Sequence, residues 1–204
     1  MEIDTPHGIA RAHLTRAEQP RGLLVLGHGA GGGVRAPDLV AARDAAVLAG
    51  FGVALVEQPY RVAGRRSPPR APVLDEAWVA VVERLRAPGV PLVTGGRSSG
   101  ARVACRTADA VGAAGVLCLA FPLVAPSGAS RQEELDGVEV PVLVVQGVND
   151  RFGMPQPAPR REVVQVAGDH GLKKDRDVIA AAVTRWLQRV ASSAANRSPS
   201  TRQS

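Results

Sequence analysis

The strongest clue to the architecture is the stretch Leu-Val-Thr-Gly-Gly-Arg-Ser-Ser-Gly-Ala-Arg-Val-Ala, residues 92–104. It opens like a buried strand and runs into a segment with the composition of a helix. Between the two, residues 96–100 read Gly-Arg-Ser-Ser-Gly, a G-x-S-x-G pattern. Gly96 and Gly100 lack the side chains that would collide where a helix closes onto a strand. The pattern therefore predicts Ser98 at the tip of a sharp turn above a sheet edge.

Short apolar runs alternate with helical patterns on both sides of this turn. Each run is continuously apolar, which is typical of strands buried on both faces of a parallel sheet. Alternation of this kind implies right-handed crossovers, so we predict a doubly wound α/β fold with about six to eight mostly parallel strands. One or two weak edge strands are expected around Ile9–Leu14. The six apolar runs are residues 22–28, 51–57, 90–96, 115–121, 140–147 and 161–168.

Two apolar stripes at helical spacing are predicted to face the core. One consists of Leu74, Trp78, Val81, Val82 and Leu85, and the other of Val178, Ala182, Trp186 and Val190. The predicted domain covers residues 1–191. Residues 192–204 are small and polar without a period, so a disordered tail is expected there.

Composition limits the classes of partner and compartment. The 204-residue chain is 45% hydrophobic, which suffices for one core, and carries a formal net charge of +6. Its basic residues are scattered, without a stripe of interleaved aromatics, so no nucleic-acid partner is expected. Cys105 and Cys118 are predicted to be buried, reduced thiols. The charged start of the chain lacks the apolar core of a secretion signal, and no apolar segment is long enough to cross a bilayer. We therefore expect a cytoplasmic protein without membrane association.

A serine nucleophile needs a base and an acid that orients the base. His170 is the only histidine after Ser98, and it directly follows the apolar run 161–168. Asp150 follows the run before that one, so Ser98, Asp150 and His170 are predicted to share one sheet edge. Two other acids compete with Asp150. Asp169 adjoins His170 but should point away from it, and Asp136 precedes a strand and should lie at the opposite edge.

The glycine-rich segment Val25–Arg35 admits two interpretations. Gly27, Gly29 and Gly32 fit the G-x-G-x-x-G pattern of dinucleotide-binding loops, with Glu57 near the position of a ribose-binding acid. Such a loop delivers phosphate directly to a helix, whereas here the chain continues to Pro37 before a helix begins. The second interpretation is an oxyanion hole, with backbone donors at Ala30, Gly31 and Ser99. His28 is then a residue that shapes the loop, and neither a metal nor another cofactor is expected.

Four motifs in order, HGAGGG, GGRSSGARVA, GVNDRFG and AGDHGL, resemble those of the α/β-hydrolase superfamily. They are similar in particular to its small dienelactone-hydrolase-like branch, which includes bacterial hydrolases and eukaryotic subunits of chromatin complexes. The resemblance implies Ser98 as nucleophile, Asp150 as acid, His170 as base, and Ala30 with Ser99 as oxyanion donors. Dienelactone hydrolases proper use cysteine as the nucleophile, so serine here puts a lactone substrate in doubt.

The sequence thus predicts a serine hydrolase acting on a small ester, thioester or related acyl compound. The short connection between residues 123 and 140 leaves no room for a helical cap, so a shallow site is expected. Its walls are predicted to include Tyr60, Arg61, Arg97, Phe121 and Phe152. The alternative is a non-catalytic interaction protein that keeps the fold.

Overall fold

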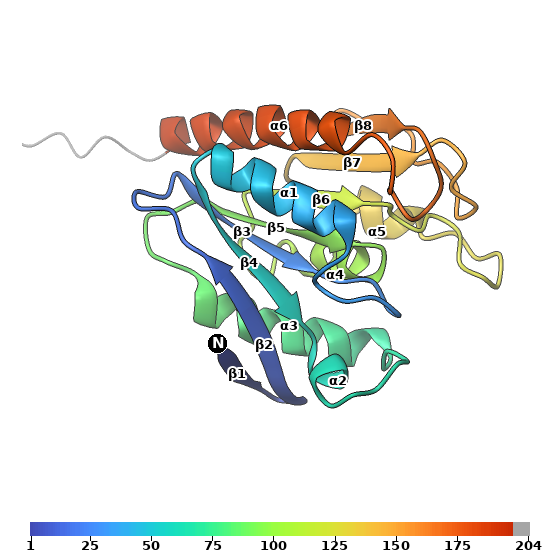
Figure 1. Cartoon of the computed structure of the whole chain (residues 1–204), viewed down its shortest axis with the longest axis horizontal. Coiled ribbons are helices and arrows are strands. Elements are labelled where there is room, and N and C mark those ends of the chain that lie inside the picture. The colour runs from blue at the N-terminus through green and yellow to red at the C-terminus, as the bar shows by residue number, and fades with distance from the viewer. Residues whose placement is uncertain (198–204) are drawn as a thin grey trace, which may run out of the picture.

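The computed structural model describes residues 1–197. An eight-stranded sheet lies at its centre, with strand order β1-β2-β4-β3-β5-β6-β7-β8 (Figure 1). The strands are β1 (Glu2–Thr5), β2 (Gly8–Thr15), β3 (Gly22–Gly27), β4 (Phe51–Glu57), β5 (Leu92–Arg97), β6 (Gly115–Leu119), β7 (Val142–Gly147) and β8 (Arg161–Val166). The helices are α1 (Pro37–Leu48), α2 (Pro59–Val62), α3 (Ala71–Leu85), α4 (Ser99–Thr107), α5 (Gln132–Asp136) and α6 (Arg176–Arg197).

The sheet is parallel from β4 through β8, whereas β2 pairs antiparallel with both β1 and β4. All six apolar runs form strands, and residues 9–14 belong to β2, which lies next to the edge strand β1. The predicted α/β class, strand number and mostly parallel sheet are therefore confirmed.

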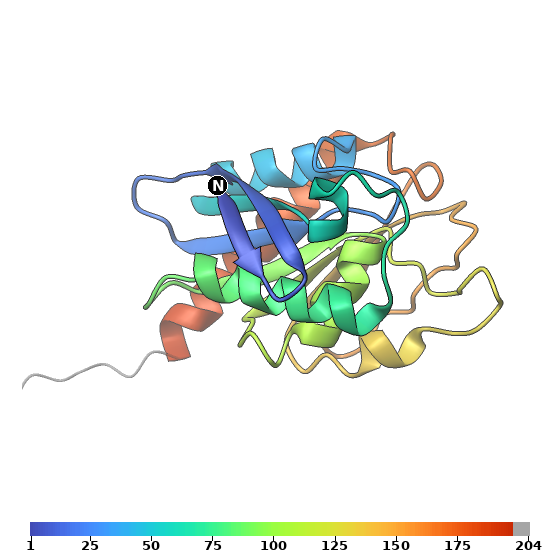
Figure 2. The same cartoon turned by 90° about the horizontal axis from the view of Figure 1, so that it is seen from below.

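Helices cover both faces of the sheet (Figures 1 and 2). Helices α1 and α6 pack together on one face, and α3, α4 and α5 lie on the other. Each face has its own core. One is built around Trp78 and Phe121, and the other around Phe51 and Trp186. The central strands read as continuous apolar runs because both of their faces are buried.

The chain follows the order of a doubly wound sheet, which creates a switch point between β3 and β5. From β3 the chain first adds β4 on one side, and it later returns to add β5 on the other. Ligands of such sheets bind in the crevice at the carboxyl ends of the strands at this point. The glycine-rich segment after β3 and Ser98 after β5 meet there.

The connection from β6 to β7 confirms the absence of a cap. It spans residues 120–141 and carries only the short helix α5.

The carboxyl-terminal helix differs from the sequence prediction in two ways. Val178 is 45% exposed, whereas Ile179 is fully buried, so the core stripe is shifted by one residue at the start of α6. The helix also continues to Arg197, through residues 192–197 that were expected to be disordered. Alanine-rich sequence favours continuation of a helix, and the Ser192 hydroxyl donates to the Gln188 carbonyl one turn earlier. The remainder of the predicted tail, residues 198–204, lies outside the described residues.

Candidate active site

Ser98 lies at a sharp turn between β5 and α4. Its backbone adopts φ 52° and ψ −108°, a conformation that side-chain-bearing residues rarely take. The Ser98 amide donates to the Leu119 carbonyl over 2.9 Å, which fixes the turn to the neighbouring strand. The serine is therefore held in a strained backbone above the sheet edge, as the G-x-S-x-G pattern predicts.

The two glycines of the pattern make this turn sterically feasible. A Cβ atom on Gly100 would lie 3.0 Å from Gly27 Cα and closer still to the Gly27 carbonyl oxygen. A Cβ atom on Gly96 would lie 3.0 Å from Gly100 Cα. The amino end of α4 thus packs backbone to backbone against the end of β3.

The turn brings Ser98 next to His170. His170 Nε2 lies 2.9 Å from Ser98 Oγ, and His170 Nδ1 lies 2.8 Å from Asp150 Oδ2. The Asp150 side chain is fully buried, and that of His170 is 19% exposed. The structure therefore joins the three predicted side chains in one hydrogen-bonded chain, although 72 residues separate the hydroxyl from the imidazole in sequence.

Asp150 is held by further hydrogen bonds. Its Oδ1 accepts from the Phe152 amide over 2.9 Å, and its Oδ2 accepts from Gln146 Nε2 over 2.8 Å. Gln146 also donates to the carbonyls of Phe121 and Gly153. This glutamine is not among the residues predicted from the sequence. The available signal is its position as the one polar side chain within the buried apolar run Val142–Gln146.

The two competing acids are placed elsewhere. Asp169 makes no hydrogen bond to the His170 ring within the described residues, and its Oδ1 accepts from the Gly171 amide over 2.9 Å. This hydrogen bond is the main reason why the pKa of Asp169 lies below its ordinary value. Asp136 pairs with Arg161, at the amino end of β8.

The glycine-rich segment after β3 passes close to the nucleophile. A Cβ atom on Gly29 would lie 3.5 Å from Ser98 Cβ. The Ala30 carbonyl accepts from Tyr60 Oη over 2.8 Å, which anchors the segment to α2. Within residues 1–197, the amides of Ala30 and Gly31 have no hydrogen-bond acceptor in the protein. Helix α1 begins only at Pro37, so these glycines do not open a helix as a phosphate-binding loop would.

His28 shapes this segment, as predicted. Its ring is buried, and Nε2 accepts from the Gln58 amide, so Nδ1 carries the hydrogen and donates to the Gly29 carbonyl over 2.8 Å. Burial lowers the pKa of His28 and keeps the ring neutral. Glu57, the acid of the dinucleotide interpretation, lies beside Arg11 and His13 on the neighbouring strand β2.

The five predicted wall residues lie in different environments. The Phe152 ring meets the His170 ring edge-on, with centroids 4.6 Å apart. Phe121 is fully buried in the core, and Tyr60 is 6% exposed with its pKa raised by burial to about 12. Arg61 donates to the Arg65 carbonyl. Arg97 forms an ion pair with Asp38 and a hydrogen bond to the His170 carbonyl. Phe152 is therefore the wall residue that directly contacts the imidazole.

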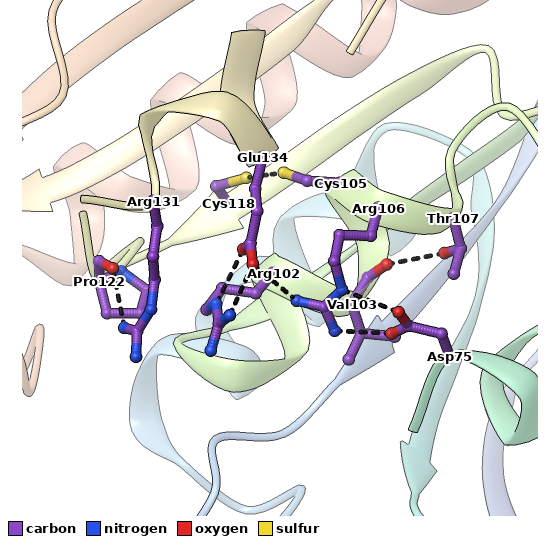
Figure 3. Close-up of polar contacts among 10 residues, drawn as sticks. All are labelled: Asp75, Arg102, Val103, Cys105, Arg106, Thr107, Cys118, Pro122, Arg131 and Glu134. Carbon is purple, nitrogen blue, oxygen red and sulfur yellow. Dashed lines mark hydrogen bonds and ion pairs between the residues drawn. The ribbon is translucent and has the colours of Figure 1, made fainter. Parts of the chain in front are cut away.

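Helix α4 is tied to both of its neighbours by ion pairs, as Figure 3 shows. Arg102 makes two hydrogen bonds to Glu134 of α5, and Arg106 makes two to Asp75 of α3. Behind them, Cys105 and Cys118 lie with their sulfurs 3.5 Å apart. Both are free and buried, as predicted, and the hydrogen bond with Cys105 together with burial raises the pKa of Cys118.

A cavity of about 1080 Å³ opens at the amino-terminal edge of the sheet, beside Leu92 and Pro141, and is therefore remote from Ser98. Within residues 1–197, no group of three or more His, Cys, Asp or Glu side chains is arranged to hold a metal ion. No helix in this part of the chain is both long and apolar enough to cross a membrane.

Comparison with solved structures gives the same architecture. An α/β serine hydrolase without a lid from Xanthomonas campestris superimposes with a TM-score of 0.79 at 20% identity, covering 93% of each chain. Est1E from Butyrivibrio proteoclasticus, in a structure with ferulic acid bound, gives 0.77 at 14% identity, covering 94% of this chain and 99% of that one. A dienelactone hydrolase from Anabaena variabilis gives 0.73 at 16% identity, covering 93% and 95%.

A sequence search of curated proteins finds no significant match. A family model described as "Alpha/beta hydrolase domain" matches residues 20–197, which include the turn at Ser98 and the segments carrying Asp150 and His170. The chain therefore belongs to the α/β-hydrolase family.

Proposed function

We propose that this protein is a serine hydrolase that cleaves small esters, thioesters or related acyl compounds. The observation that carries the proposal is the hydrogen-bonded chain from Ser98 through His170 to the buried Asp150. A serine hydroxyl is a weak nucleophile by itself, and this arrangement supplies the base and the acid that it needs. Family membership supports hydrolysis as the reaction class.

The proposed reaction has two halves. In the first, His170 Nε2 takes the proton of Ser98 Oγ while that oxygen attacks the substrate carbonyl, and the imidazolium then returns the proton to the leaving group. In the second, His170 activates a water molecule that releases the acyl group from Ser98. Asp150 holds the Nδ1–H tautomer and stabilises the imidazolium charge.

The proposed oxyanion hole uses the backbone amides of Ser99 and of Ala30 or Gly31. Ser99 begins α4, so its amide has no acceptor within the helix. The closeness of the glycine-rich segment to Ser98 supports Ala30 or Gly31 as the other donor, since a Cβ on Gly29 would lie 3.5 Å from Ser98 Cβ. One donor of this kind contributes about 3 to 4 kcal/mol to transition-state stabilisation.

The substrate is proposed to be a small acyl compound that reaches Ser98 without a cap to cross. Phe152 and Arg61 remain proposed wall residues, together with Tyr60, Phe121 and Arg97. The alternative, a non-catalytic interaction protein, requires the Ser98–His170–Asp150 arrangement to persist without turnover.

Covalent labelling tests the proposal. A fluorophosphonate probe is expected to modify the wild-type protein and to leave Ser98→Ala unlabelled, because the probe needs the activated hydroxyl. Ser192→Ala, on the remote helix α6, is the matched control and should be labelled like wild type. Wild type and Ser98→Ala reacting equally poorly, together with an ester panel showing no Ser98-dependent turnover, would favour the non-catalytic alternative.

A further inference from the structure

The side chain of Arg97, the residue directly before the proposed nucleophile, contacts three other segments of the protein. Arg97 ends β5, and its side chain is 19% exposed. Its Nη2 donates to the His170 carbonyl over 2.9 Å. Its Nε lies 3.0 Å from Asp38 Oδ2. Its Nη1 lies beside Gly29, where a Cβ atom added to the glycine would be 2.9 Å from this nitrogen. One guanidinium therefore touches the histidine loop, the first turn of α1 and the glycine-rich segment.

Asp38 is an unusual anchor because its carboxylate is completely buried. Burial raises the pKa of Asp38, while the Arg97 charge and the hydrogen bond from the Leu39 amide act in the opposite direction. Arg97 Nε and Asp38 Oδ2 form a close ion pair. A buried charge of this kind is stable only with its partner, so Asp38 and Arg97 depend on each other.

The histidine loop is held at several points, and Arg97 supplies the contact at His170 itself. The loop connects β8 to α6 through residues 167–175, and it includes Leu172 at φ 44° and Asp175 at φ 52°. The His170 ring is held by Asp150 through Nδ1, and the loop backbone is tied beside His170 by hydrogen bonds at the Gly168 and Asp169 carbonyls. The hydrogen bond from Arg97 holds the backbone carbonyl of His170 itself.

We propose that Arg97, anchored by Asp38, is a positioning residue that holds His170 Nε2 within hydrogen-bond distance of Ser98 Oγ. This inference rests on the proposed hydrolase function, but its geometry can be tested separately. It gives Arg97, the first x residue of the G-x-S-x-G motif, a role in holding the base next to the nucleophile. A displacement of about 1 Å in a reacting group can reduce a rate by about 100-fold, so a small shift of the loop is enough to matter.

The alternative role for Arg97, as one of the predicted wall residues, is binding of a substrate carboxylate. The two roles make different kinetic predictions. Loss of a carboxylate-binding residue raises KM for an anionic ester and leaves an uncharged ester unaffected. Loss of a positioning residue lowers kcat for both esters and leaves KM nearly unchanged.

The test compares Arg97→Met, Arg97→Lys and Asp38→Asn with wild type. Arg102→Met is the matched control, because the Arg102 side chain also pairs with a carboxylate, that of Glu134, and makes no hydrogen bond to the histidine loop within residues 1–197. Kinetics are measured with p-nitrophenyl acetate, which is uncharged, and with a p-nitrophenyl hemisuccinate ester, which is anionic. Arg97→Met is expected to lose about tenfold or more in kcat on both esters, with Arg97→Lys and Asp38→Asn intermediate and Arg102→Met like wild type.

A second readout does not depend on turnover. The downfield proton NMR signal of the His170 Nδ1–H that bonds to Asp150 is expected in wild type and Arg102→Met, and broadened or lost in Arg97→Met. An unchanged signal and unchanged kcat in all Arg97 and Asp38 variants would overturn the inference, as would a loss confined to KM for the anionic ester. Absence of Ser98-dependent turnover in wild type would instead refute the hydrolase proposal, and the NMR comparison would still decide the role of Arg97.

Discussion

At the scale of single residues, the site depends on positions where only a hydrogen fits. Gly100 lies against the backbone of Gly27, and Ser98 holds a positive φ that side-chain-bearing residues avoid. The Gly27 backbone cannot yield as a flexible side chain would, since it is the end of the central strand β3. The close approach of α4 to β3 therefore determines the position of the Ser98 hydroxyl.

Replacing Gly100 by alanine is expected to destabilise the protein by about 3 kcal/mol, because the new Cβ would overlap the Gly27 backbone. Urea unfolding followed by circular dichroism measures the change. Gly33→Ala is the control, because a Cβ there meets nothing within 4 Å, and it should change stability by less than about 1 kcal/mol. Equal stability of Gly100→Ala and wild type would show that α4 does not pack as described.

The sequence identified the residues that carry the chemistry better than those that support them. Ser98, Asp150 and His170 could be located because each follows an apolar run, and the ends of parallel strands share one edge. The role of Gln146 and the pairing of Arg97 with Asp38 could not be predicted. Both contacts depend on how side chains from different elements are oriented in the folded structure. The burial of Phe121 could not be predicted either, because its position at the end of an apolar run fits both the core and the site.

At the scale of elements, the helix behind the nucleophile is held by charge as well as by apolar packing. Arg102 and Arg106 of α4 extend to Glu134 and Asp75 on the flanking helices (Figure 3). Burial alone would raise the pKa of Glu134, but the hydrogen bonds and charges of the two arginines outweigh burial and bring it below its ordinary value of 4.5. Glu134 therefore contributes to stability in its ionised form.

This contribution has a defined pH dependence. It is fully present above about pH 4.5, where the unfolded chain is also ionised, and it is lost as the pH falls through the lower pKa of the folded state. Glu134→Gln is expected to lose about 1 to 3 kcal/mol at neutral pH, and the difference from wild type should shrink in acid. Urea unfolding between neutral pH and about pH 3 measures it. Glu133→Gln, exposed on the same helix, should match wild type, and a pH-independent deficit for Glu134→Gln would contradict the argument.

Element boundaries were harder to predict than element types. The continuous apolar runs specify strands, because a sheet covered on both faces requires them. The start and end of α6 were misjudged for different reasons. Adjacent Val178 and Ile179 are equally apolar, and only packing selects Ile179 for the core. Polar composition after residue 191 resembles that of a tail, but helix propagation needs no apolar face once the preceding turns are formed.

At the scale of the whole molecule, the order of the strands brings the site together. Ser98 follows β5, Asp150 follows β7 and His170 follows β8, all at the carboxyl edge of one sheet. The glycine-rich segment reaches the same edge from β3, across the switch point. A doubly wound topology could be predicted from the alternation of strands and helices. The depth of the site could not, since it depends on how the connecting loops fold over the edge.

The central claim is that Ser98 becomes acylated during turnover. The direct measurement is mass spectrometry of protein quenched in acid while it hydrolyses p-nitrophenyl acetate, followed by peptide mapping. The account predicts one added acetyl group on the peptide that contains Ser98, and none in Ser98→Ala. Undiminished Ser98→Ala turnover, or an acetyl group carried by another residue with Ser98 unmodified, would contradict it.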